Sequence, residues 1–185
     1  RELKKIRSFI RSRPVKNDFE ILFLENFEKM YRTADDILAR METSGCRKLF
    51  EESVSKGSVV HGDYNYHNLI MLRDDIAVTD FEHMHTDIQI KDFCYFLRME
   101  KNQWKQKTGQ KILEAYEEVR PLSEREKEFA ALSLAYPGKF KKIAGSYYRS
   151  NKAHLSEKNV EKLQICIRQT EEKYEFLSRI FPLNL

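Results

Sequence analysis

Apolar residues recur with helical spacing over most of the chain. The strongest periodic signal covers residues 19–41 and repeats every three or four positions, as one buried helix face requires. Other stripes with helical spacing cover residues 1–11, 93–99, 110–116 and 156–181. The chain is therefore predicted to be mostly α-helical.

Local signals mark where some of these helices begin and end. Asn17 with Glu20, and Ser123 with Glu126, have the three-residue spacing of a capping box. A helix that starts after the second box is predicted to end at Pro137-Gly138.

Strand-like character is confined to residues 58–81. Short apolar runs at 59–60, 69–72 and 76–78 are separated by polar or turn-forming residues, with a turn at 73–75 between the last two. The predicted fold class is α+β, mostly α, with a small antiparallel β-hairpin.

The stretch HGDYNYHN, residues 61–68, stands between the first apolar run and the hairpin. Asp63 precedes Asn68 by five residues, and Asp80 follows at the end of the second hairpin strand. A carboxylate can orient and deprotonate a hydroxyl, while an amide oxygen and a second carboxylate can bind Mg²⁺. Phosphoryl transfer depends mainly on such positioning and charge neutralisation. The order H-x-D, then Asn five residues after the Asp, then D-F after a strand is the kinase template.

These segments also resemble a known group of enzymes. HGDYNYHNLIM and IAVTDFE resemble motifs of the aminoglycoside phosphotransferase and choline kinase superfamily, which is related to protein kinases. Gly62 and Asn65, where protein kinases carry Arg and Lys, fit its small-molecule branch. Stretches along nearly the whole chain, from NDFEILFLENFEKMYRTADDIL to YPGKFKKIAGSYYRSNKAHL, are similar to the spore coat protein S (CotS) family.

The resemblance implies a role for each polar residue of the motif. Asp63 and His61 form the catalytic set, with Asp63 as the base and His61 shaping the loop through backbone contacts. Asn68 and Asp80 are the implied Mg²⁺ ligands. Asp92 is expected to cap its helix and brace the catalytic loop. The implied reaction transfers the γ-phosphate of ATP to a hydroxyl of an unknown small molecule.

The resemblance also predicts that part of the enzyme is not in this chain. The few glycines never form G-x-G, so a Gly-rich phosphate loop is missing, and so are the strand lysine and its paired acid. We therefore expect residues 1–185 to form a single domain, the C-terminal lobe of a protein-kinase-like fold, with the N-terminal nucleotide-binding lobe absent. The first residue, Arg1, fits a piece of a longer protein. The isolated chain should bind ATP very weakly.

Composition narrows the remaining function classes. The net charge of +4 is mild and does not require nucleic acid as a partner. No apolar run approaches the roughly 20 residues of a membrane span, and the first residues lack a signal peptide. Three scattered cysteines, Cys46, Cys94 and Cys166, are predicted to be reduced, buried thiols of a cytosolic protein. The resemblance adds the spore coat as the location and other coat proteins as candidate partners.

Alternatives to a working phosphotransferase stay open. His61, His67, His83 and His85, near Asp63, Asp80 and Asp87, could instead belong to a metal-dependent hydrolase, although no pair has helical i, i+4 spacing. The same fold could also be a catalytically silent scaffold of the spore coat, since fold and function separate readily. The basic stretch 139–152 could contact an acidic partner, but it is expected to be a solvated helix face with Tyr147 or Tyr148 turned inward.

Overall fold

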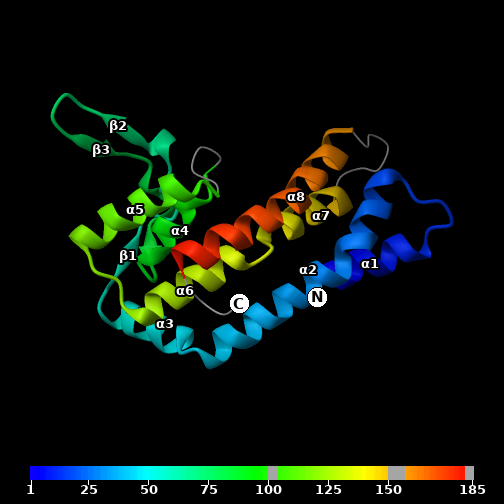
Figure 1. Cartoon of the computed structure of the whole chain (residues 1–185), viewed down its shortest axis with the longest axis horizontal. Coiled ribbons are helices and arrows are strands. Elements are labelled where there is room, and N and C mark those ends of the chain that lie inside the picture. Colours follow the sequence, from blue (N-terminus) through cyan, green and yellow to red (C-terminus); the bar gives the residue numbers. More distant parts are fainter. Residues whose placement is uncertain (100–103, 150–156, 182–185) are drawn as a thin grey trace. The chain divides into compact units, whose positions relative to one another are not determined.

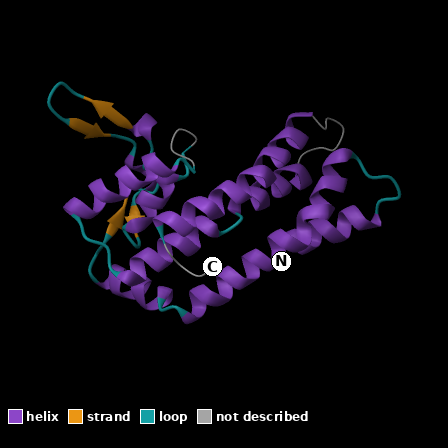
Figure 2. Ribbon diagram, in the orientation of Figure 1, coloured by secondary structure: helices purple, strands orange, loops and turns teal. Residues whose placement is uncertain are grey.

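The computed structural model describes residues 1–99, 104–149 and 157–181 (Figure 1). The helices are α1 (Glu2–Ser12), α2 (Asp18–Thr43), α3 (Cys46–Ser55), α4 (Ile90–Leu97), α5 (Gln106–Val119), α6 (Glu124–Ala135), α7 (Gly138–Arg149) and α8 (Glu157–Ile180). The strands are β1 (Val59–Val60), β2 (Leu69–Met71), β3 (Ile76–Val78) and β4 (His85–Thr86). The predicted class, mostly helical with small antiparallel β elements, is confirmed (Figure 2). No helix in the described ranges is both long and apolar enough to cross a membrane.

The chain divides into two compact units. Unit 1 comprises Arg1–Ala39 and Tyr136–Tyr174, and unit 2 comprises Arg40–Ala135 and Glu175–Leu185. The helices α2 and α8 contribute to both units. The expectation that the whole chain is one domain, a C-terminal lobe, stays a prediction.

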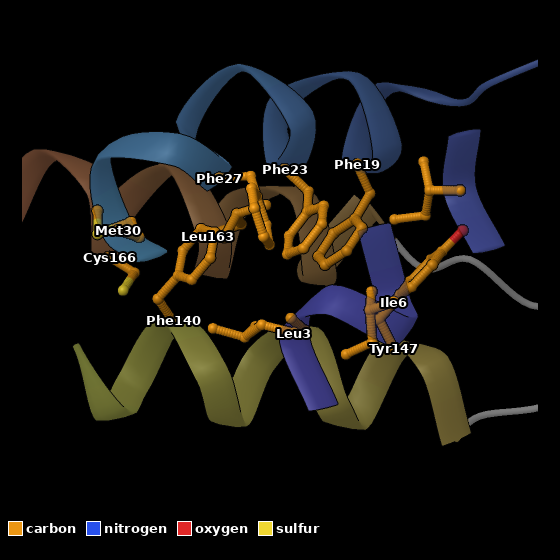
Figure 3. Close-up of a cluster of buried hydrophobic side chains, with 12 residues drawn as sticks. Leu3, Ile6, Phe19, Phe23, Phe27, Met30, Phe140, Tyr147, Leu163 and Cys166 are labelled. Carbon is orange, nitrogen blue, oxygen red and sulfur yellow. The ribbon is translucent and has the colours of Figure 1, made fainter. Parts of the chain in front are cut away.

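Unit 1 is built around an aromatic core (Figure 3). The rings on one face of α2 point toward α7, where Phe23 stacks on Phe140 with centroids 5.4 Å apart and Phe19 stacks on Tyr147 at 4.1 Å. Each such pair contributes about 0.5–1.5 kcal/mol beyond the burial of its area. The buried members of this core are Leu3, Ile6, Ile10, Phe19, Phe23, Phe27, Met30, Phe140, Ala144, Tyr147, Leu163 and Cys166. The helical stripes predicted from the sequence therefore do form a core.

The carboxylate of Glu20, in the first turn of α2, is fully buried. Glu20 accepts hydrogen bonds from Arg13 at 2.6 Å, from the Asn17 amide at 3.1 Å and from the Tyr147 hydroxyl at 3.0 Å. The Asn17 side chain in turn accepts from the Glu20 amide at 3.0 Å, which confirms the first predicted capping box. A buried charge is tolerated here because it is both paired and hydrogen-bonded.

The basic stretch at 139–152 behaves as predicted over its described part, which ends at Arg149. Lys139, Lys141 and Lys142 are exposed on α7. Tyr147 is buried, whereas Tyr148 is 40% exposed. Residues 150–152 lie outside the described residues, as does Ser156, where the last helix was predicted to begin.

Unit 2 packs α3 to α6 and the last part of α8 around a second core. Phe93 of α4 contacts Tyr116 of α5 at 5.1 Å and Phe181 at 6.4 Å between ring centroids. Gly109 lets α5 approach closely, since a Cβ there would lie 2.3 Å from the ring of Phe176. These contacts pack α4, the helix that carries Asp92, against α5 and Phe181.

The start of α6 and the break after it follow the sequence signals. The Ser123 amide donates to the Glu126 carboxylate at 3.0 Å, and the Glu126 amide donates to the Ser123 hydroxyl at 3.3 Å, which confirms the second capping box. The helix ends at Ala135 and α7 begins at Gly138, so the predicted break is confirmed as well.

The four strands form two small antiparallel sheets within unit 2. The predicted hairpin is confirmed: β2 pairs with β3, with Ile70 opposite Ala77. It projects away from α4 and α5 in Figure 1. The second sheet was not predicted, because β4 has only two residues and both are exposed. In it β1 pairs with β4, with Val60 opposite His85. Because of this pairing, the segment that follows Asp80 lies beside the residues that follow β1.

Candidate active site

Residues 61–68, the motif loop, connect β1 to β2. Asn65 shapes the loop from within: its side chain accepts from the His67 amide at 2.8 Å and donates to the Asp63 carbonyl at 3.0 Å. Such local bonds let Asn favour turns over regular structure. They cap the short 3-10 turn Tyr66–Asn68, which leads directly into β2.

Asp92 of α4 holds the start of the motif loop. Its carboxylate accepts hydrogen bonds from the backbone amides of His61, at 2.6 Å, and Gly62, at 3.0 Å. Hydrogen bonds to an ionised acceptor are the strong ones. The prediction that Asp92 caps α4 is wrong, because the helix begins at Ile90 with Gln89 at the N-cap position. Asp92 therefore lies in the first turn, and its carboxylate bonds the loop.

Gly62 brings the motif loop against the turn Phe81–His83. Its φ is +81°, a left-handed conformation that favours glycine. A Cβ at this position would lie 2.3 Å from the carbonyl oxygen of His83. Only a residue without a side chain allows this approach, which places the residues after Asp80 beside the loop.

His61 joins the motif loop to the residue before Asp80. The ring is buried, with Nε2 at 2.9 Å from the Thr79 carbonyl oxygen. The Asp63 amide donates to its Nδ1 at 3.3 Å. This pattern fits the neutral tautomer with its proton on Nε2. Both ring nitrogens thus bond backbone groups, while a catalytic role for His61 stays a prediction.

Asn68 lies against Asp63. The buried Asn68 side chain donates from Nδ2 to the Asp63 carbonyl at 3.0 Å and to Asp63 Oδ2 at 3.3 Å. Because Nδ2 makes these bonds, the acceptor atom Oδ1 is not used in them. The amide orientation that supports the Asp63 carboxylate thus leaves an oxygen suited to a cation.

Asp80 follows directly after a residue that bonds Asn68. The Thr79 amide donates to the Asn68 carbonyl at 3.0 Å, so the hairpin brings the two predicted metal ligands into neighbouring positions. Asp80 has a φ of +67° and an exposed side chain. A non-glycine residue in this conformation costs on the order of 1 kcal/mol or more, and such residues cluster at functional sites.

The oxygen atoms of Asn68 and Asp80 fit a hard cation. Mg²⁺ is usually bound through one or two carboxylates together with water and phosphate oxygens, rather than by an all-protein cage. Within the ranges that the structure describes, the Asp80 carboxylate makes no hydrogen bond or ion pair with protein. The same ranges contain no group of three or more His, Cys, Asp or Glu side chains arranged to hold a metal ion. The donor set therefore suits Mg²⁺ shared with a phosphate; that these residues bind it stays a prediction.

The Asp63 carboxylate has a partner that the sequence analysis missed. A hydrogen bond from the Tyr95 hydroxyl of α4 is the largest cause that lowers the pKa of Asp63, followed by bonds from Asn65 and Asn68. The same bond raises the pKa of Tyr95. The Asp63 carboxyl group therefore stays ionised at lower pH than an ordinary aspartate does. The only sequence signal was that Tyr95 follows Asp92 by three positions, on the same side of a helix.

A row of rings supports the site from the Asp80 segment to α4. Phe81 lies 4.8 Å from His61, His61 lies 6.0 Å from Tyr64, and Tyr64 lies 5.6 Å from Phe96, measured between ring centroids. These contacts link the hairpin end, the motif loop and the helix. The positions of Asp63 and Asp80 are thus coupled by packing as well as by hydrogen bonds.

The other histidines are engaged in local contacts. His85 Nδ1 lies 2.7 Å from the His83 carbonyl oxygen, and its Nε2 lies 3.3 Å from Asp87. The His67 ring packs on Tyr66 with centroids 4.2 Å apart. These contacts, with His61 turned to backbone groups, argue against the hydrolase alternative.

Comparisons with known proteins bear on the fold and the relatives of this chain. No family model matches the sequence. Spore coat protein S of Bacillus subtilis (strain 168) is 24% identical over 166 residues, which cover 88% of this chain and 47% of that protein. The crystal structure of an aminoglycoside phosphotransferase from Alicyclobacillus acidocaldarius matches with a TM-score of 0.85 at 21% identity, over 97% of this chain and 54% of the other. The chain spans about half the length of each. It is similar in sequence to spore coat protein S and has the kinase-like fold of an aminoglycoside phosphotransferase.

Proposed function

We propose that this chain is the catalytic-loop half of a phosphotransferase that transfers the γ-phosphate of ATP to a hydroxyl of a small molecule with Mg²⁺. The observation that carries the proposal is the adjacency of three residues. Asn68 bonds the Asp63 carboxylate, and the residue before Asp80 bonds the Asn68 carbonyl. The parts that bind the nucleotide would correspond to the region of the related proteins that this chain does not cover.

Asp63 would orient the acceptor hydroxyl and receive its proton. Its pKa is lowered by neighbouring donors, so the carboxylate is ionised and ready to accept a hydrogen bond. A weak base is sufficient, because phosphoryl transfer has a loose transition state in which positioning matters more than early proton removal. The acceptor would lie where the half-buried loop meets solvent.

The metal ligands would be Asn68 and Asp80. Their oxygen atoms would hold Mg²⁺, whose charge would offset that of the ATP phosphates. Asp92 would act through the loop, since its carboxylate fixes the backbone amides of His61 and Gly62. His61 would keep the loop joined to the Asp80 segment through the Thr79 carbonyl.

The test is ATP turnover by a protein that combines this chain with its nucleotide-binding lobe, across a panel of small hydroxylated acceptors. Asp63→Asn should lower the rate by about 100-fold or more, as expected for loss of an acid–base group. Asp74→Asn is the matched control, since Asp74 is an exposed carboxylate in the hairpin turn. Equal rates for Asp63→Asn and wild type would show that the assigned base is wrong. The isolated chain should give no calorimetric ATP–Mg²⁺ signal in the micromolar range.

A second candidate is a catalytically silent scaffold in the spore coat. It is favoured by the similarity to a relative named as a spore coat protein. Coat location and binding to other coat proteins would then be the function of the chain. A fluorescent fusion in sporulating cells tests this: coat localisation kept by Asp63→Asn, together with no turnover by wild type on any acceptor, would favour the scaffold.

A further inference from the structure

We propose that Asn65 is a positioning residue of the candidate active site, an inference that rests on the phosphotransferase function proposed above. Its side chain fixes the direction of the Asp63 carbonyl, and this carbonyl sets the direction in which the Asn68 side-chain oxygen faces. Asn65 therefore acts on the reaction through Asn68, a predicted metal ligand, rather than through a contact with the acceptor.

The Asn65 side chain is bonded at both ends within the motif loop. It is buried, with 7% of the residue exposed. Its Oδ1 accepts a hydrogen bond from the His67 amide at 2.8 Å, and its Nδ2 donates to the Asp63 carbonyl at 3.0 Å. One side chain thus joins the residue two positions before it to the residue two positions after it. A buried amide that is bonded in this way holds the loop in one conformation.

The carbonyl oxygen of Asp63 links Asn65 to Asn68. It accepts from Nδ2 of Asn65 and from Nδ2 of Asn68, each at 3.0 Å, and a carbonyl oxygen has the two lone pairs that these bonds require. Asn68 Nδ2 also donates to Asp63 Oδ2 at 3.3 Å. Both partners of this nitrogen are acceptors, so the Asn68 amide keeps its NH₂ group toward Asp63. Its Oδ1 therefore faces away from Asp63, as a cation ligand requires.

The backbone of the loop forms a framework that does not depend on the Asn65 side chain. The Asn68 amide donates to the Asn65 carbonyl at 3.1 Å and closes the 3-10 turn Tyr66–Asn68. The Asn68 carbonyl accepts from the Thr79 amide at 3.0 Å, one residue before Asp80. Loss of one side-chain bond of Asn65 should therefore turn the Asn68 amide while the pairing with Thr79 is kept.

The substitution Asn65→Asp separates the two bonds of this side chain. A carboxylate can still accept from the His67 amide, but it has no hydrogen to donate to the Asp63 carbonyl. Two oxygen atoms would then face each other, so the carbonyl should turn away. The added negative charge by itself would strengthen Mg²⁺ binding, whereas loss of the Asn68 orientation weakens it. The sign of the change therefore distinguishes positioning from an effect of charge.

Asn26→Asp is the matched control. Asn26 Nδ2 donates to the Leu22 carbonyl at 2.9 Å on α2, in unit 1. The same substitution there removes a bond of the same kind and adds the same charge outside the motif loop.

The first experiment needs neither catalysis nor metal. The side-chain amide signals of Asn68 are recorded by NMR in the 185-residue chain, as wild type, Asn65→Asp and Asn26→Asp. We expect Asn65→Asp to shift these signals and to raise their hydrogen-exchange rate about tenfold, the effect of one lost hydrogen bond. Asn26→Asp should leave both unchanged.

The backbone amide signal of Thr79 shows whether the loop remains folded. Unchanged Asn68 side-chain signals in Asn65→Asp, with the Thr79 signal intact, would overturn the proposal. If Asn65→Asp does not fold, Asn65→Ser is read in the same way, since a serine hydroxyl can still accept from the His67 amide but cannot replace both ends of the asparagine amide.

The second experiment measures turnover in the protein with its nucleotide-binding lobe, at fixed ATP and varied Mg²⁺. In Asn65→Asp the Mg²⁺ concentration that gives half-maximal rate should rise on the order of tenfold. A merely less stable protein would lose kcat at an unchanged Mg²⁺ requirement, so an unchanged or lower requirement would overturn the positioning role. No turnover by wild type on any acceptor would instead overturn the proposed function, and the NMR comparison would then decide alone whether Asn65 orients Asn68.

Discussion

Replacement of Gly62 by alanine tests whether the motif loop and the Asp80 segment depend on each other. A Cβ at residue 62 would lie 2.3 Å from the His83 carbonyl oxygen, which belongs to backbone and cannot rotate away. Non-bonded carbon and oxygen atoms need more than 3 Å, so the loop or the turn Phe81–His83 must move by roughly 1 Å. Asp80 directly precedes this turn and should move with it.

The chain offers a matched control at Gly57. Its φ of +68° is close to the +81° of Gly62, but a Cβ there would meet no atom within 4 Å. Alanine at Gly57 therefore carries only the left-handed conformational cost, on the order of 1 kcal/mol. Alanine at Gly62 adds the clash, for which overpacking costs of about 1–3 kcal/mol apply. We expect losses in the free energy of unfolding of about 1 kcal/mol at Gly57 and about 2–4 kcal/mol at Gly62.

Urea unfolding followed by circular dichroism measures both losses, with an unchanged m-value as the check that only stability has changed. Amide chemical shifts of residues 80–83 report the displacement directly. They should change in Gly62→Ala and stay constant in Gly57→Ala. Equal losses of stability in the two variants, with no shift changes in this turn, would refute the close approach of loop and turn.

Three further variants or measurements test other parts of the molecule. Asp80→Ala should remove Mg²⁺-dependent ATP binding, measured by calorimetry on the protein with its nucleotide-binding lobe, and leave the circular dichroism spectrum intact; loss of folding would indicate a structural role instead. Tyr147→Phe removes the hydroxyl that donates to buried Glu20 and should cost about 1 kcal/mol in urea unfolding. The exposed neighbour Tyr148→Phe should cost almost nothing, and equal losses would contradict this pairing. Burial raises the pKa of Cys94 to about 12, so iodoacetamide at pH 8 should label it only after unfolding, and rapid labelling of the native protein would contradict its burial.

The sequence by itself determined the parts of this protein that depend on near neighbours in the chain. The capping boxes at Asn17 and Ser123 formed as predicted, because their partners are three residues away. The β2–β3 hairpin formed because its strands are joined by a short turn. The same local spacing placed Asp63 beside Asn68, five residues apart within one loop.

Only the tertiary structure decided the contacts between residues far apart in the chain. The Asp92 carboxylate bonds the amide of His61, 31 residues away, instead of capping its own helix. The strand β4 pairs with β1, although its residue pattern indicated no partner. The physical reason is that a polar side chain can form hydrogen bonds with several different partners, and tertiary packing decides which of them it bonds. The motif residues could therefore be identified from the sequence, whereas the residues that hold the motif in place could be identified only from the folded structure.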